Sequence, residues 1–189
     1  MNYIILDLEA TCWNEKHHKN ISETIEIGAI CVNEKKEILG EFQTFIKPTL
    51  HLQLSDFCQN LTSITQEMVE NAPLFPVALS NFQAWIQSFG GEYFLGSWGF
   101  YDKSQFQKDC LLHQLDTNWL KNHINIKFQH AQIRNLSKGI GMKAAIHHEK
   151  LELDGIHHRG IDDARNIVKI FIKLFDKWNY NLDSSQKHD

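Results

Sequence analysis

The spacing of apolar and polar residues along the chain predicts five strands. Residues 2–9 run from apolar positions into two carboxylates, Asp7 and Glu9, which is typical of a buried strand with an acidic end. Residues 24–32 and 38–46 are rich in β-branched side chains and flank a polar turn, which indicates a hairpin. Two shorter stretches predict the remaining strands, at residues 92–98 and 123–126.

Apolar residues at helical spacing, with glycine or proline at several boundaries, predict the helices. Five stretches qualify: residues 76–89, 102–115, 129–138, 142–150 and 161–178. We expect residues 50–60 to be irregular, with Thr62 or Ser63 capping a short helix after them. A hairpin followed by alternating helices and strands predicts an α/β fold, with a mixed sheet flanked by helices.

The composition is that of a globular protein. The chain has 189 residues, of which 42% are hydrophobic, enough for one domain with a sizeable core. We expect this domain at residues 1–180 and a fraying polar tail at 181–189. The N-terminal apolar run is too short for a signal peptide or a membrane span. The four cysteines are scattered, which favours reduced thiols in a cytoplasmic protein.

The charge is unevenly distributed. The net charge of −4 argues against a protein that coats nucleic acid. Residues 103–150, however, hold eight Lys or Arg and three acidic residues, so this stretch is basic and the remainder is acidic. A basic half would meet phosphates while acidic residues elsewhere hold metal. The alternative is that these lysines are scattered over solvated faces.

The carboxylates of the first strand favour a metal site. Side chains alternate along a strand, so Asp7 and Glu9 point to the same face. Two adjacent carboxylates repel each other near a core, and a hard divalent cation such as Mg²⁺ relieves the repulsion. The alternative is a strand that simply ends in solvent.

Later segments offer partners for this pair. Asp102 follows the fourth predicted strand and opens a helix, although helix capping alone explains an acid there. His158 lies in a loop, and Asp163 lies one turn into the longest predicted helix, close to its apolar stripe. Its neighbour Asp162 has the simpler explanation that acids favour the first turn of a helix.

Together these side chains suit phosphodiester hydrolysis. Carboxylates that hold two divalent ions activate a water molecule and stabilise the leaving oxygen. An imidazole with a pKa near its ordinary value of about 6.5 is suited to take the proton from that water. The candidate catalytic set is Asp7, Glu9, Asp102, His158 and Asp163.

The same residues resemble the three exonuclease motifs of the DEDDh (DnaQ-like) 3′–5′ exonucleases. Asp7-Leu-Glu9 follows a strand, Asp102 follows a later strand, and His158 stands five residues before Asp163. Longer stretches are similar to the Eri/3′hExo-like branch, which includes histone-mRNA 3′-end exonucleases and bacterial KapD-type proteins. These stretches are residues 7–12, 54–58, 61–65, 96–98 and 160–166.

The resemblance implies a ribonuclease H-like fold and two Mg²⁺ or Mn²⁺ ions. It makes Asp7, Glu9 and Asp163 metal ligands, gives Asp102 a role at the second ion, and makes His158 the general base. The implied activity is removal of nucleoside 5′-monophosphates from the 3′ end of single-stranded nucleic acid, most of all RNA.

The resemblance also implies substrate contacts. Phe57 and Trp98 match positions that stack on the terminal nucleotide, although core packing would also explain Trp98. Backbone groups near Ala10 and Thr11 would meet the 3′-terminal hydroxyl. One departure concerns the motif aspartate, which directly follows the tryptophan in animal members, whereas residues 99–101 intervene here.

Two other functions stay open at this stage. The first is an exonuclease that prefers DNA or very short oligonucleotides to RNA. Alternatively, the chain would be a non-enzymatic regulatory protein, as the bacterial relatives' role as inhibitors of a kinase pathway suggests. The presence of all five candidate catalytic residues favours an enzyme. The sequence identifies no protein partner.

Overall fold

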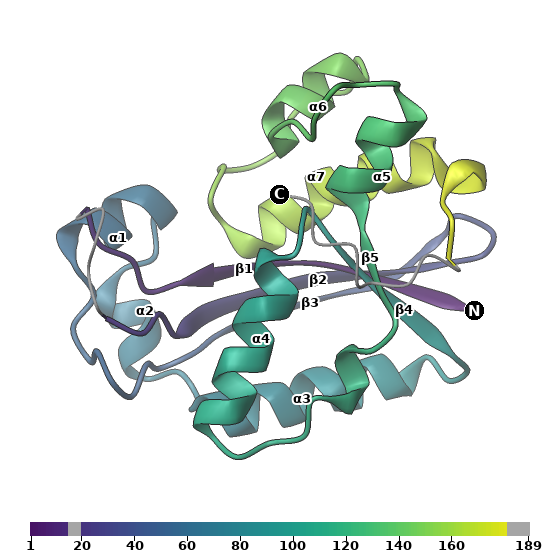
Figure 1. Ribbon diagram of the computed structural model, residues 1–189. Helices are drawn as coiled ribbons and strands as arrows, with labels where there is room; N and C mark the ends of the chain where they lie inside the picture. The colour runs from purple at the N-terminus through teal and green to yellow at the C-terminus, as the bar shows by residue number, and fades with distance from the viewer. Residues whose placement is uncertain (15–19, 181–189) are drawn as a thin grey trace.

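The strands form one mixed five-stranded sheet, as predicted. The computed structural model describes residues 1–14 and 20–180, so the predicted tail at 181–189 lies outside the described residues. The strands are β1 (Asn2–Ala10), β2 (Thr24–Asn33), β3 (Ile38–Phe45), β4 (Tyr93–Ser97) and β5 (His123–Asn125). Their order in the sheet is β3-β2-β1-β4-β5, with β2 and β3 antiparallel and β4 and β5 parallel to their neighbours (Figure 1). The first strand is therefore the centre of the sheet.

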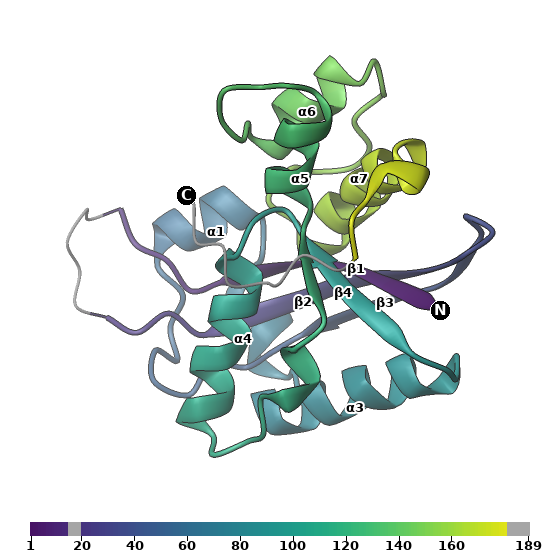
Figure 2. The ribbon, with the colours of Figure 1, turned by 45° about the vertical axis from the view of Figure 1, so that its right-hand side comes forward.

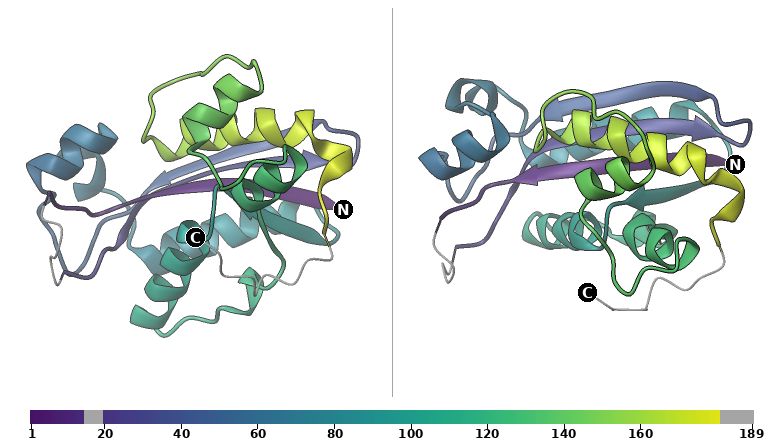
Figure 3. Two further views of the ribbon diagram at one scale, coloured as in Figure 1. Left: turned by 45° about the horizontal axis from the view of Figure 1, so that its top comes forward. Right: turned by 90° about the horizontal axis from the view of Figure 1, so that it is seen from above.

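Helices cover both faces of this sheet (Figures 1 and 2). One face carries α5 (Ile126–Ile133), α6 (Met142–His148) and α7 (Gly160–Lys173), and the other carries α3 (Phe75–Ser88) and α4 (Tyr101–Leu112). The short helices α1 (Asp56–Thr62) and α2 (Gln66–Glu70) lie beyond the carboxyl end of β1 (Figure 3). Short 3₁₀ turns occupy Asn118–Leu120 and Phe175–Lys177. Within the described part of the chain, no helix is long and apolar enough to cross a membrane.

The alternation along β1 builds two cores and leaves its acidic end for a site. Tyr3 and Ile5 pack against the helices of the α7 face, whereas Ile4 and Leu6 pack against α3 and α4. By the same alternation Asp7 and Glu9 continue the α7 face, at the carboxyl end of the strand. Because β4 is parallel to β1, the segment after β4 emerges at this end too.

The structure corrects three local predictions. Residues 50–60 are not irregular throughout, because Ser55 accepts a hydrogen bond from the Cys58 amide and starts α1. The cap of α2 is Thr65, while Ser63 takes a left-handed conformation that ends α1. The helix predicted at 129–138 begins at residue 126, because Asn125 ends β5 and also caps α5. A capping residue inside an apparent strand hid that boundary from the sequence pattern.

Candidate active site

Four carboxylates meet at the carboxyl end of β1. Asp7, Glu9 and Asp163 each offer an oxygen, and these oxygens lie within 4.8 Å of one another. Asp102, in the first turn of α4, accepts a hydrogen bond of 3.0 Å at Oδ1 from the backbone N–H of Leu8. All four carboxylates line one cleft of about 400 Å³. The structure therefore brings together the acidic residues that the sequence pattern selected.

Close packing of α7 on β2 places Asp163 at this point. Gly28 of β2 pairs with Asp7, and a Cβ atom at Gly28 would lie 2.1 Å from the backbone nitrogen of Ile161. Any larger side chain would push α7 away from the sheet. The first turn of α7 can therefore contact the strand directly, and Asp163 reaches the carboxylates of β1.

Glu26 fixes the same junction and was not predicted. Its buried carboxylate accepts hydrogen bonds from the Gly160 amide at 2.9 Å and from the Arg159 side chain at 3.2 Å. It also accepts a bond of 2.6 Å from Gln43 on β3. The signal in the sequence was a lone acid and a glycine within an otherwise apolar strand, at residues 24–32.

The site has an excess of negative charge. Burial, reinforced by neighbouring carboxylates, raises the pKa of Asp7 well above its ordinary value and that of Glu9 to about 9. Burial also raises the pKa of Asp102 to about 6, although the Leu8 amide acts in the opposite direction. Among the described residues, no lysine or arginine forms an ion pair with these three carboxylates. Such a set calls for a cation, and carboxylate oxygens are the ligands of hard divalent ions.

His158 lies at the rim of this cluster. It is the residue two places before α7, it takes a left-handed φ of 66°, and its backbone N–H donates to Oδ2 of Asp163 at 3.0 Å. Burial, and then the neighbouring His157, lower the pKa of its imidazole. The ring lines the cleft. A neutral imidazole at this position can accept a proton from a water molecule held by the carboxylates.

His157 is a second imidazole that the sequence reasoning passed over. Its Nδ1 lies 3.0 Å from Oδ2 and 3.1 Å from Oδ1 of Asp163. Its ring stacks on that of His158, with 4.0 Å between the centroids. Asp162, by contrast, turns away from the cluster and pairs with Arg165.

The predicted substrate-binding residues fall in different places. Ala10 and Trp98 line the cleft, and Trp98 also donates its indole N–H to the Ile140 carbonyl at 3.0 Å. Thr11 is buried, and its backbone N–H already donates to the backbone carbonyl of Glu23. Phe57 lies on α1 and is 37% exposed, but it does not line the cleft. The nucleotide contacts of these four residues stay predictions.

The three extra residues before the motif aspartate do not displace it. They include Tyr101, which begins α4, is 55% exposed and lines the cleft. Asp102 still reaches the Leu8 amide. The insertion therefore adds an aromatic side chain to the cleft wall, which the sequence reasoning had not assigned to the site.

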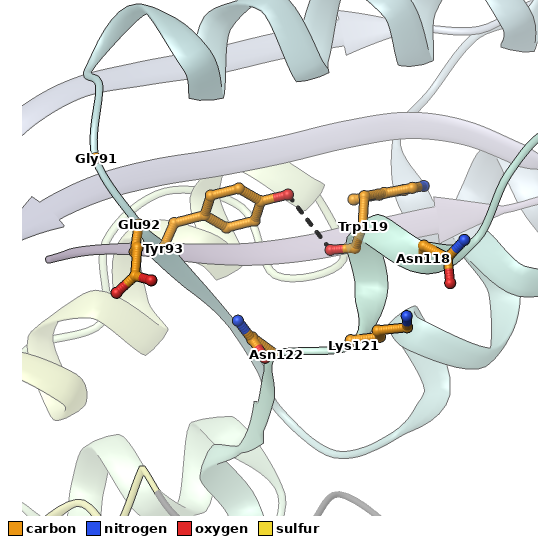
Figure 4. A pocket seen from close by; sticks show the side chains of 7 residues that line it. All are labelled: Gly91, Glu92, Tyr93, Asn118, Trp119, Lys121 and Asn122. Carbon is orange, nitrogen blue, oxygen red and sulfur yellow. Dashed lines mark hydrogen bonds between the residues drawn. The ribbon is translucent and has the colours of Figure 1, made fainter.

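A second cavity of about 290 Å³ lies at the other end of β1, where Asn2 pairs with Tyr93 (Figure 4). It is lined by Gly91, Glu92, Tyr93, Asn118, Trp119, Lys121 and Asn122. The Tyr93 hydroxyl donates to the Trp119 carbonyl there. Glu92 is its one acidic side chain, so this cavity lacks the clustered carboxylates of the cleft.

Known proteins share this sequence pattern. The Exonuclease family pattern matches residues 4–171. The 3′-5′ exoribonuclease 1 of Rattus norvegicus is 34% identical over 182 residues, covering 90% of this chain and 52% of that protein. The ERI1 exoribonuclease 2 of Xenopus laevis is 29% identical, covering 90% of this chain and 28% of that protein. The chain thus spans about half the length of the mammalian 3′-5′ exoribonuclease 1 proteins that it matches.

Solved structures agree with the sequence matches. The nuclease domain of 3′hExo, described as a DEDDh family member bound to rAMP, superposes with a TM-score of 0.91 at 27% identity, covering 96% of both chains. A 3′-exonuclease with a histone mRNA stem-loop gives 0.88 at 28% identity, covering 93% of this chain and 81% of that one. The fold is thus ribonuclease H-like, as predicted, while the similarity to bacterial KapD-type proteins stays a prediction. The chain belongs to the exonuclease family and, within it, to the Eri/3′hExo-like DEDDh exonucleases.

Proposed function

We propose that this protein is a metal-dependent 3′–5′ exonuclease that removes nucleoside 5′-monophosphates from the 3′ end of single-stranded RNA. The observation that carries the proposal is the convergence of Asp7, Glu9 and Asp163 within 4.8 Å in a cleft that His158 also lines. The names of the relatives support the choice of RNA, since several are exoribonucleases. One structural neighbour was solved with rAMP bound, which fits a mononucleotide product.

The donor set fits hard divalent ions. Asp7, Glu9 and Asp163 supply only oxygen ligands, and their charge has no lysine or arginine partner among the described residues. They would hold Mg²⁺ or Mn²⁺, with Asp102 supporting a second ion beside β1. Bound there, the ions would lower the pKa of water and neutralise charge on the phosphate.

The protein's own groups orient the reaction. The ring of His158 takes the proton from the attacking water, whose oxygen bonds to phosphorus while the bond to the 3′ oxygen of the preceding nucleotide breaks. The Leu8 amide holds Asp102 in place, and Glu26 holds the loop-helix junction that carries His158 and Asp163. Glu26 lies outside the cleft lining, so it positions the reacting groups without touching substrate, whereas Leu8 lines the cleft and holds Asp102 through its backbone N–H.

The cleft suits a single terminal nucleotide. Its volume of about 400 Å³ lies at the lower end of the range for small-molecule sites. Trp98 and Tyr101 offer aromatic surface for a base, and Phe57 lies on the adjacent helix α1. Stacking on such rings tolerates every base, which suits an enzyme that trims unrelated 3′ ends. Backbone groups near Ala10 and Thr11 would receive the terminal hydroxyl. We expect this activity in the cytoplasm.

The test is nucleotide release from a 5′-labelled single-stranded RNA in Mg²⁺ or Mn²⁺. Wild-type protein should shorten the labelled RNA from its 3′ end, and Asp7→Asn should abolish this shortening. Glu152→Gln removes an exposed acid away from the cleft and should behave as wild type. Equal rates for wild type and Asp7→Asn would refute the site.

A competition among single-stranded RNA, single-stranded DNA and dinucleotides separates the substrate classes. If DNA or dinucleotides are degraded faster than RNA, they are the preferred substrate, and the assignment of the catalytic residues is unaffected. If calorimetry detects neither Mn²⁺ nor Mg²⁺ binding, the regulatory, non-enzymatic function gains support instead.

A further inference from the structure

We propose that His157, His158 and Asp163 form a site for an imidazole-preferring divalent ion such as Zn²⁺, distinct in ligand chemistry from the all-carboxylate set. The two sites share Asp163 and no other ligand. Occupation of the nitrogen-containing site takes both Asp163 and the base away from hydrolysis. Binding at this site does not depend on the proposed nuclease activity, whereas the inhibitory consequence does.

The geometry of the three side chains carries the proposal. One donor atom from each lies within 4.8 Å of the others. Nδ1 of His157 already faces both oxygens of Asp163, at 3.0 and 3.1 Å. The left-handed backbone at His158 brings its ring over that of His157. An ion between these atoms would need Zn–N and Zn–O distances of about 2.0–2.2 Å, which modest rotations of two cleft-lining rings can supply.

The chemistry of the donors selects the ion. Two imidazoles and one carboxylate are a common ligand set for zinc, which leaves a fourth position for water. Mg²⁺ and Mn²⁺ favour oxygen ligands and would stay with Asp7, Glu9 and Asp163. Zn²⁺ binds nitrogen-containing sites more tightly than Mn²⁺ does in the usual order of divalent metals.

Charge separates this cluster from the other histidine cluster of the molecule. His130, His148 and Glu149 also have donor atoms close together. There, however, Arg134 holds both oxygens of Glu149, at 2.7 and 2.6 Å, and neutralises the carboxylate. Among the described residues, Asp163 pairs with His157 and with no lysine or arginine. Its charge is therefore available to a cation, and the cluster around Glu149 serves as an internal comparison.

The consequence for activity follows from the shared residues. His158 cannot accept a proton through a nitrogen whose lone pair is bound to metal. Asp163 would be a ligand of both sites, so a Zn²⁺ ion bound to its carboxylate would weaken its coordination of Mg²⁺. Zn²⁺ at low concentration should therefore inhibit nucleotide release that Mg²⁺ supports, if the proposed nuclease function holds.

The first test is spectroscopic and needs no nuclease activity. Co²⁺ replaces Zn²⁺ as a coloured probe, and imidazole ligation in a four-coordinate site gives strong visible bands. Wild-type protein should show these bands, and Zn²⁺ should remove them by displacement. The variant His157→Asn should bind Zn²⁺ at least about 10-fold more weakly, since even indirect partners of metal ligands contribute that much. The matched control His148→Asn alters the comparison cluster and should keep wild-type bands.

The outcomes are decisive in each direction. Equal Zn²⁺ affinity in wild type and His157→Asn would overturn the proposal, as would loss of the bands in His148→Asn alone. If His157→Asn fails to fold, X-ray absorption of the wild-type zinc complex decides: a shell without imidazole scattering contradicts the site. Nucleotide release measured in Mg²⁺ before zinc is added tests the nuclease function separately. If the protein shows the visible bands but releases no nucleotide, the zinc site is supported and the proposed nuclease function is refuted.

Discussion

The backbone N–H of Leu8 donates to Oδ1 of Asp102 across 3.0 Å, so a carboxylate from α4 is bound between the two acidic residues of β1. Leu8 itself points to the opposite face, where it packs against the α3 and α4 side of the sheet. Asp102 thus has two tasks. It satisfies a buried backbone donor, and it places negative charge beside Asp7 and Glu9.

These two tasks can be separated by substitution. In Asp102→Asn the side-chain oxygen still accepts from Leu8, so the free energy of unfolding should hold or rise, because a buried charge is removed. Nucleotide release should fall about 100-fold or more. In Asp102→Ala the Leu8 amide loses its acceptor, and the free energy of unfolding should also fall by about 1–3 kcal/mol. Urea denaturation beside the rate assay checks both variants, and equal stability of the two would contradict the structural task.

The sequence pattern was sufficient where the chemistry is local. The alternation along residues 2–9 correctly placed Asp7 and Glu9 on one face, and the sequence pattern correctly placed His158 in the loop before a helix and Asp163 in the first turn of that helix. It failed for residues whose importance depends on distant contacts. Gly28 needs to be small only because α7 packs against it, and such an approach is invisible in a local window. His157 became part of the site through a backbone twist at its neighbour.

Gly28 should not tolerate even one methyl group. A Cβ there would lie 2.1–2.4 Å from the backbone of Gly160 and Ile161, and backbone atoms cannot yield as a flexible side chain can. Gly28→Ala should lower the free energy of unfolding by about 3 kcal/mol. It should also weaken metal binding, because α7 carries Asp163. Gly141→Ala is the matched control for stability, since its Cβ would meet nothing within 4 Å. Equal melting curves for the two variants would show that α7 does not pack as described.

Metal affinity should rise with pH. Burial and neighbouring carboxylates raise the pKa of Glu9 to about 9, from an ordinary value of 4.5. Between these values the metal-free folded protein retains a proton that the unfolded chain has released, so its stability falls as pH rises. A divalent ion must displace such protons. For each proton displaced, the metal affinity should therefore rise by up to about 10-fold per pH unit. Calorimetry of Mg²⁺ binding at pH 6 and pH 8, in buffers of different ionisation enthalpy, measures this. Binding without proton release would contradict it.

His158→Asn should remove the base and spare the fold. The backbone of residue 158 is left-handed, with a φ of 66°, and asparagine adopts that conformation more readily than most residues. The amide cannot act as a proton acceptor at neutral pH, so the rate should fall by about 10²–10⁴-fold. Melting temperature and Mg²⁺ affinity should stay near wild type. Full activity of His158→Asn would show that another group acts as the general base.

The two predicted stacking residues should behave differently. Trp98 donates its indole N–H to the Ile140 carbonyl, so Trp98→Phe keeps an aromatic ring in the cleft but leaves that carbonyl without its donor. Its free energy of unfolding should fall by about 1–3 kcal/mol, with a small change in KM. Phe57 is 37% exposed on α1, so Phe57→Ala should change stability by less than about 0.5 kcal/mol. If Phe57 stacks on a base, KM for RNA should rise about 10-fold, since one stacked base contributes about 1–3 kcal/mol. An unchanged KM in Phe57→Ala would leave Trp98 and Tyr101 as the aromatic surface of the site.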